Sequence, residues 1–154
     1  MDQKCERLLA GTQTYNARGH QLTERFLKEL EQEARLPAAL CMGDWEVLDA
    51  AVHIGGKPSM ARIARALKVN PSSVSRSVRR LQENGLLAKA ADPADERGFL
   101  VTPTQEGTAF HAALSARLGE VLRQMLTGVS EEQLSTVFAF SDHCTDFLRN
   151  LLNK

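Results

Sequence analysis

The chain has 154 residues, of which 43% are hydrophobic and 25% charged, a composition typical of one globular domain and not of a disordered or fibrous segment. A chain of this length buries roughly 68–70% of its unfolded surface, so we expect a core that needs neither disulfides nor a structural metal. Aromatic residues make up only 5%, which argues against an aromatic stacking platform for single-stranded nucleic acid. The formal net charge is zero, which by itself predicts no attraction to nucleic acid or to membranes.

The overall charge balance conceals a segregated basic segment. Every charged residue between Lys57 and Gln82 is positive, whereas the rest of the chain carries more acidic than basic residues. Local clustering of positive charge matters for phosphate binding more than the net charge does. The sequence therefore predicts one basic module within an otherwise acidic protein.

Cysteine usage and the N-terminal residues indicate a reduced, cytoplasmic protein. The three cysteines, Cys5, Cys41 and Cys144, are widely spaced and form no metal-ligand motif. The N-terminus has no apolar stretch typical of a signal peptide, and no apolar run approaches the length of a membrane span. We expect no membrane association and no cofactor.

Helices dominate the prediction for the first half of the chain. Apolar residues spaced four apart predict an amphipathic helix over 16–36 that ends before Pro37. A second helix over 44–52 ends at the paired glycines Gly55 and Gly56.

Two further helices are predicted close together, separated by a tight turn. Ser59 is expected to cap a helix over 60–67. Asn70 and Pro71 provide a cap and a first-turn proline for the next helix, which runs to Asn84. The arrangement is a helix-turn-helix.

The hydrophobic period changes after this pair. Runs 86–89 and 99–102 predict two short strands that form a hairpin with a charged tip. A long helix is expected over 104–125, and a capping box at 130–133 opens a last helix ending near Leu152. The last helix is apolar over more than one face, which a monomer's surface helix would not need, so we expect it to lie in a dimer interface.

The helix that begins at Pro71 is typical of a DNA recognition helix. Val74, Val78 and Leu81 recur at helical spacing and are expected to point inward. The opposite face then carries small hydroxyls and arginines, which suit close approach to a groove and bidentate contacts to guanine or phosphate. A solvated arginine face is the alternative interpretation.

The predicted hairpin after this helix would form the wing of a winged helix. Arg97 lies in its tip, where an arginine is suited to a narrow minor groove. Asp92 and Asp95 lie close enough in sequence to pair with that guanidinium. An exposed ion pair of little energetic value is the alternative.

The stretch from Leu67 to Gly107 contains NPSSVSRSVRRLQENGL at 70–86, DER at 95–97 and TQEG at 104–107. With these motifs it resembles the MarR family of transcriptional regulators, and the order of helices extends the resemblance over nearly the whole chain. It implies a mainly α fold with a small β-hairpin wing, in which 39–103 form a winged helix-turn-helix lobe while 1–38 and 104–154 form helical dimerisation regions.

The resemblance also implies function and site residues. It implies a homodimer that binds a pseudo-palindromic operator in double-stranded DNA and is released by a small aromatic or phenolic effector. The DNA-contacting positions would be Asn70, Ser72, Ser73, Ser75, Arg76, Arg79 and Arg97, with Asp95 orienting the wing. Two residues depart from the family pattern, namely Cys41, where a threonine or serine cap is usual, and Pro103, where a leucine is usual.

Two kinds of trigger could release the predicted regulator from DNA, a small-molecule effector or cysteine oxidation. Polar residues among apolar ones near the dimerisation helices are the effector candidates, and these are Tyr15, Arg18, His20, Trp45, Asp49 and His111. For each, a structural role in the core or solvent contact is the alternative. Cys5 and Cys144 are the redox candidates, with burial as a small apolar residue the alternative for Cys144. The four histidines are scattered, so no metal site is predicted.

The leading hypothesis is therefore a dimeric DNA-binding repressor. A redox-responsive regulator and a winged-helix module that binds an acidic protein partner are the alternatives. Nothing in the sequence indicates an enzyme, since it has no recognisable nucleophile with its base, no glycine-rich phosphate loop and no metal triad.

Overall fold

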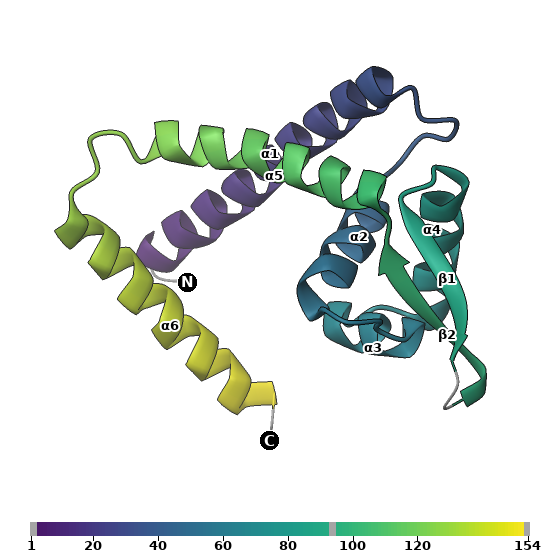
Figure 1. Ribbon diagram of the computed structural model, residues 1–154. Helices are drawn as coiled ribbons and strands as arrows, with labels where there is room; N and C mark the ends of the chain where they lie inside the picture. The colour runs from purple at the N-terminus through teal and green to yellow at the C-terminus, as the bar shows by residue number, and fades with distance from the viewer. Residues whose placement is uncertain (1–2, 93–94, 153–154) are drawn as a thin grey trace. The chain divides into compact units, whose positions relative to one another are not determined.

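The computed structural model describes residues 3–92 and 95–152, which fall into two compact units, 1–118 and 119–154. The first unit contains α1 (Gln3–Ala34), α2 (Met42–Ile54), α3 (Met60–Leu67), α4 (Pro71–Glu83), β1 (Leu87–Asp92) and β2 (Asp95–Pro103). Helix α5 (Gln105–Met125) runs across the boundary into the second unit, which also contains α6 (Glu131–Leu152). The fold is mainly helical with one two-stranded antiparallel hairpin, as predicted (Figure 1).

Helix α1 is longer than the sequence predicted. It begins at Gln3 instead of residue 16, because residues 3–15 contain no proline to stop a helix although they lack regularly spaced apolar residues. Its contribution to the core comes from Leu27 and Leu30, which are buried. The helix ends where Arg35 adopts the left-handed conformation and the Leu36 amide donates to the Glu31 carbonyl.

The predicted inward face of α4 packs in the core of the first unit, together with buried side chains of the other helices and of the hairpin. Val74, Val78 and Leu81 are each at most 1% exposed. The Ser59 hydroxyl accepts the Arg62 amide at 3.3 Å, which confirms the predicted cap of α3. Asn70 occupies the N-cap position of α4 and Pro71 its first turn, as predicted, although the Asn70 side chain makes no capping hydrogen bond.

The hairpin is confirmed, and its strands are longer than predicted. The pairing runs from Leu87 opposite Pro103 to Asp92 opposite Asp95, so the strands take up most of the predicted tip. The Lys89 ammonium lies 3.6 Å from the centre of the Phe99 ring on the neighbouring strand, a cation–π contact. Figure 1 shows the hairpin extending beyond the helical core beside α4.

A close contact joins the base of the hairpin to α5. The Thr104 hydroxyl accepts the Gly107 amide at 2.9 Å, which caps α5, and donates to the Gly85 carbonyl at 2.7 Å. A Cβ atom added to Gly107 would overlap the Leu86 carbonyl. A glycine is therefore required at this position because two backbone segments touch there.

The second unit contains the apolar helix that the sequence predicted. The Ser130 hydroxyl accepts the Gln133 amide at 3.2 Å and the Gln133 side chain accepts the Ser130 amide at 2.9 Å, which confirms the capping box. Large apolar side chains are exposed along α6, among them Val137, Phe138, Phe140, Phe147, Leu148 and Leu151. Among the described helices, none has the length and apolar character needed to cross a membrane.

Candidate nucleic-acid interface

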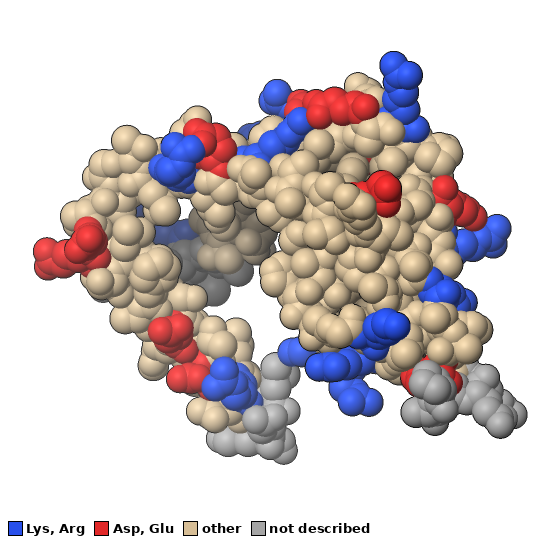
Figure 2. Space-filling model, in the orientation of Figure 1, with Lys and Arg blue, Asp and Glu red and all other residues tan. Residues whose placement is uncertain are grey.

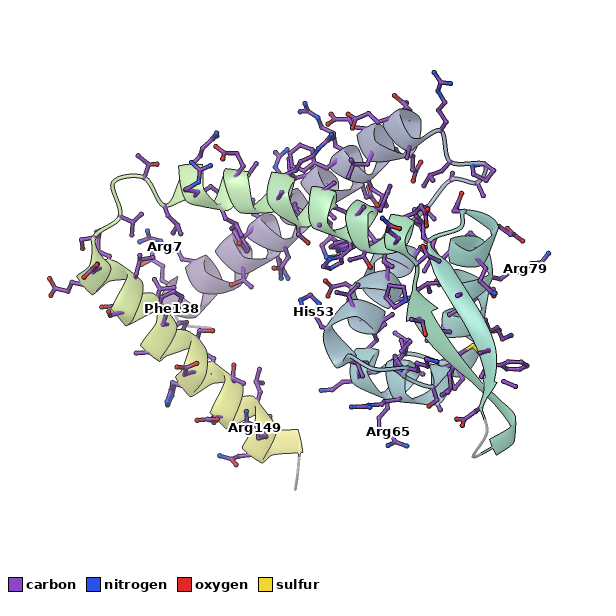
Figure 3. All side chains as sticks on the ribbon, in the orientation of Figure 1. Arg7, His53, Arg65, Arg79, Phe138 and Arg149 are labelled. Atoms are coloured by element: carbon purple, nitrogen blue, oxygen red, sulfur yellow. The ribbon has the colours of Figure 1, made fainter. Side chains whose placement is uncertain are left out.

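The outward face of α4 carries the polar residues that the sequence predicted for it. Ser72, Ser75, Arg76 and Arg79 are exposed, while Ser73 is half-buried. They lie opposite the buried Val74, so the helix presents a basic, hydroxyl-rich surface on one side only. Figure 3 shows Arg79 pointing outward from α4, away from the helical core.

Local contacts orient two of these arginines. The Arg76 guanidinium donates to the Ser73 hydroxyl at 3.4 Å, and Arg79 Nε donates to Glu83 Oε1 at 2.9 Å. Both pairs are exposed, so they contribute little to folding stability. The Arg79–Glu83 pair partly neutralises the C-terminal end of the face, and Arg76 nearer the N-terminus is without an acidic partner among the described residues.

Arg80 follows Arg79 directly but is directed inward. Its Nε and Nη2 donate to the two carboxylate oxygens of Asp44 at 2.8 and 2.9 Å, and Asp44 is completely buried. Burial raises the pKa of Asp44, but hydrogen bonds from Arg80, Ser77 and Cys41 outweigh it and hold that pKa below its ordinary value. Arg80 therefore does not belong to the exposed face of α4, because its side chain anchors α4 to the start of α2.

Helix α3 adds positive charge next to α4. Arg62, Arg65 and Lys68 are exposed, and no acidic residue occurs in α3. Figure 2 shows Lys and Arg side chains gathered at the lower edge of the molecule, where Figure 3 places Arg65. The basic segment predicted from the sequence thus places exposed cations on both α3 and α4.

The structure describes the wing only in part. The backbone of Asp95 and Arg97 belongs to β2, but their side chains lie outside the described residues, as does the side chain of Cys5. Their predicted roles therefore remain predictions. Asp92, at the end of β1, is half-buried.

Three of the six effector candidates come together and three do not. His111 Nε2 lies 2.8 Å from Asp49 Oδ1, and the His111 ring stacks on Trp45 with 4.9 Å between ring centres. By contrast, Tyr15, Arg18 and His20 are exposed along α1. His53, which was not among the predicted candidates, lies one helical turn after Asp49 and joins the same cluster. The four-residue spacing was the signal that could have found it.

A hollow in the first unit contains none of the six candidates. It has a volume of about 570 Å³ and is formed by the end of α1, the end of α4 and the start of α5. Apolar side chains dominate its lining, with one basic and two acidic side chains among them. The lining residues include Leu30, Leu36, Leu86, Phe110, Arg35, Glu33 and Glu106.

Two cysteines have described side chains. Cys41 begins α2 and is exposed, and its sulfur accepts a hydrogen bond from Arg80 Nη2 at 3.4 Å. Cys144 is half-buried in α6 and makes no disulfide. The departure from the family pattern at Cys41 leaves the helix start intact, because the Asp44 carboxylate accepts the Cys41 amide at 2.9 Å.

Comparison with known proteins agrees with this geometry. Residues 43–98, 56 of the chain's 154, match the sequence model of the MarR family. The fold is similar to that of Staphylococcus aureus MarR in complex with salicylate and kanamycin, at 14% identity and a TM-score of 0.80 over 97% of this chain and 95% of that one.

Two further solved structures share the fold. A MarR protein from Peptoclostridium difficile has 17% identity and a TM-score of 0.75, over 93% of this chain and 88% of that one. A cysteine-to-serine variant of E. coli MarR complexed with operator DNA has 20% identity and a TM-score of 0.69, over 94% of this chain and 99% of that one. These identities are low, so the structures support the fold alone.

Proposed function

Because residues 43–98 make this chain a member of the MarR family, we propose that it is a sequence-specific DNA-binding regulator of transcription that acts as a homodimer. The observation that carries the proposal is the one-sided α4, whose buried face is apolar and whose exposed face carries hydroxyls and arginines. A related fold, that of E. coli MarR, has been solved with operator DNA.

In this proposal α4 enters the major groove. Ser72, Ser73 and Ser75 are small enough to let the helix approach base edges, and Arg76 reads a guanine or binds a phosphate. Arg79 exchanges Glu83 for a phosphate, and Asn70 lies at the helix N-terminus, where backbone amides favour an anion.

The wing and α3 supply the remaining contacts. Arg97 enters the adjacent minor groove, with Asp95 as its orienting partner. Arg62 and Arg65 are exposed on α3, beside α4, and neutralise backbone phosphates. Each neutralised phosphate steepens the dependence of log affinity on log salt by about 0.9.

The exposed apolar side chains of α6 support the proposed dimer. The two-fold symmetry of such a dimer would set the spacing of the two DNA half-sites. Phe138 and Phe147 are 63% and 60% exposed in the single chain, an arrangement that water disfavours and a second copy would cover. We divide the chain accordingly, with 39–103 binding DNA and with 1–38 and 104–154 forming the dimer. A two-fold dimer reads half-sites about 10 bp apart.

We further propose that the regulator is a repressor released by a small aromatic or phenolic acid. Staphylococcus aureus MarR, whose fold is similar, has been solved with salicylate. The hollow beside Phe110 has a volume within the usual range for ligand sites, and Arg35 at its lining offers a cation for a carboxylate. Redox release through Cys5 or Cys144 is the alternative trigger.

The test is a mobility shift of the purified protein on the DNA that flanks its own gene, at two salt concentrations. We expect a specific complex that weakens by several decades between low and physiological salt. Arg76→Ala should blunt base discrimination, and Arg97→Ala should reduce the preference for A·T pairs beside the half-sites. Arg25→Ala on α1 is the matched control, since among the described residues Arg25 pairs only with Glu29 on the same helix.

The outcomes separate the alternatives. Release by one member of a panel of aromatic acids supports the effector proposal, and release by peroxide alone supports the redox alternative. Full competition by unrelated duplex DNA contradicts sequence-specific binding. Absence of any complex contradicts the proposed function and favours the protein-interaction module.

A further inference from the structure

We propose that Asp49, His53 and His111 form a binding site for one divalent transition-metal ion of the zinc class. Each residue offers one ligand atom, and the three atoms all lie within 4.8 Å of one another. This inference concerns a different part of the first unit from the DNA-facing side of α4 and does not depend on the proposed function.

The cluster is built from two helices. Asp49 and His53 lie one turn apart on α2, so both side chains leave the same face of that helix. His111 comes from α5, 62 residues after Asp49 in the chain. Asp49 Oδ1 lies 2.8 Å from His111 Nε2 and 3.2 Å from His53 Nδ1.

These distances fit metal coordination with small side-chain movements. Zinc binds imidazole nitrogen and carboxylate oxygen at about 2.0–2.2 Å, which separates neighbouring tetrahedral ligands by about 3.4 Å. A bound ion replaces the hydrogen bond between Asp49 and His111, and the neutral imidazole coordinates through Nε2 as the tautomer that carries its proton on Nδ1. Three protein ligands leave the fourth tetrahedral position to a water molecule.

The donor set indicates the class of metal. Two imidazoles with one carboxylate suit zinc, cobalt, nickel and copper, whereas magnesium and calcium prefer oxygen ligands throughout. Figure 3 shows His53 on the edge of α2, pointing away from the helical core. Its side chain is 67% exposed and that of Asp49 is 43% exposed, so an ion has access to the site.

The buried ligand is already held in place. His111 is only 8% exposed, and its ring stacks nearly parallel on Trp45, at an interplanar angle of 17°. Packing of this kind restricts ring rotation and lowers the ordering cost of coordination. Because His111 lies on α5 and the other two ligands lie on α2, a bound ion would link the two helices directly.

The test is titration of the full-length, untagged protein with Co²⁺, followed by displacement with Zn²⁺. We expect saturable binding with the visible absorption bands of tetrahedral cobalt. We also expect quenching of fluorescence from Trp45, the chain's single tryptophan, because paramagnetic Co²⁺ would lie beside the ring on which it stacks.

Variants separate this site from chance surface binding. His53→Ala removes an exposed ligand without opening the core, and it should weaken Co²⁺ binding by more than the roughly 10–100-fold that outer-shell substitutions cost. Asp49→Asn should do the same. His143→Ala is the matched control, since it removes an exposed histidine from α6, and should leave the affinity unchanged.

Three results would overturn the proposal. These are the absence of saturable Co²⁺ binding in the wild-type protein, equal affinity of the wild type and His53→Ala, and loss of binding on His143→Ala. Circular dichroism of each variant verifies that it is folded. Neither DNA binding nor effector release enters any of these readouts, so failure here leaves the proposed function untouched.

Discussion

Replacing Arg80 with methionine should destabilise the fold, although Arg80 belongs to the most basic stretch of the chain. The substitution keeps an unbranched side chain of similar length and removes only the charged head. Asp44, which is completely buried, then loses two hydrogen bonds of 2.8 and 2.9 Å and its only charged partner among the described residues.

The expected loss of stability in Arg80→Met depends on the burial of Asp44. Leaving a buried charge without its partner typically costs about 3–5 kcal/mol. The Arg80 side chain is 38% exposed, so solvent screening reduces its share, and Ser77 and the Cys41 amide still bond to the carboxylate. We therefore expect a loss of about 2–4 kcal/mol in the free energy of unfolding at pH 7.

The pH dependence gives a second readout. In the wild type the pKa of Asp44 is lowered, so its contribution is fully present above the ordinary value of 3.8 and is lost as the pH falls through the lowered value. Without Arg80, no cation offsets the burial of Asp44, so the pKa of Asp44 rises in the variant. Protonation of Asp44 in acid then removes the unpaired buried charge and its cost to the variant's stability. The stability difference between the two proteins should therefore shrink as the pH falls from 7 toward 3.5.

Urea unfolding at several pH values measures both effects. Arg79→Met is the matched control, because within the described part of the chain this neighbouring arginine makes only the exposed pair with Glu83, and it should cost less than about 0.5 kcal/mol. Equal costs for the two variants, or a difference between Arg80→Met and the wild type that grows in acid, would refute the reasoning.

Three further predictions concern other parts of the chain. Gly107→Ala should cost about 1–3 kcal/mol in urea unfolding, because its Cβ atom meets the Leu86 carbonyl, whereas Gly119→Ala on the same helix meets nothing and should be neutral or stabilising. Phe138→Asp should convert the dimer to monomers in sedimentation velocity, and an unchanged dimer would contradict the assignment of α6. Zn²⁺ at about 100 times its dissociation constant should raise wild-type stability by about 2.7 kcal/mol and shift Tm upward, and His53→Ala should abolish that shift.

Features that depend on neighbouring residues along the chain could be predicted before the fold was known. Ser59, Thr104 and Ser130 cap helices because the amides they accept lie three residues later, a distance that the chain alone controls. The inward face of α4 could be predicted in the same way, because apolar residues at helical spacing lie on one side of the helix.

Which of two adjacent arginines faces solvent depends on long-range packing. Arg79 and Arg80 have the same chemistry, and only the position of Asp44, 36 residues before Arg80, separates the exposed member from the anchored one. Asp44 did not stand out in the sequence as a partner for Arg80. Acidic residues are common in the first turn of a helix, where they interact favourably with the helix dipole.

Tertiary structure also decided how the candidate sites are composed. His111 meets Asp49 and Trp45 only because α5 returns to α2 after the hairpin, and the hollow beside Phe110 exists only where α1, α4 and α5 converge. Local patterns report which residues share a helical face, since that depends on a period of 3.6 residues. Which faces then meet depends on how helices far apart in sequence pack, and that is settled by burial of the core as a whole.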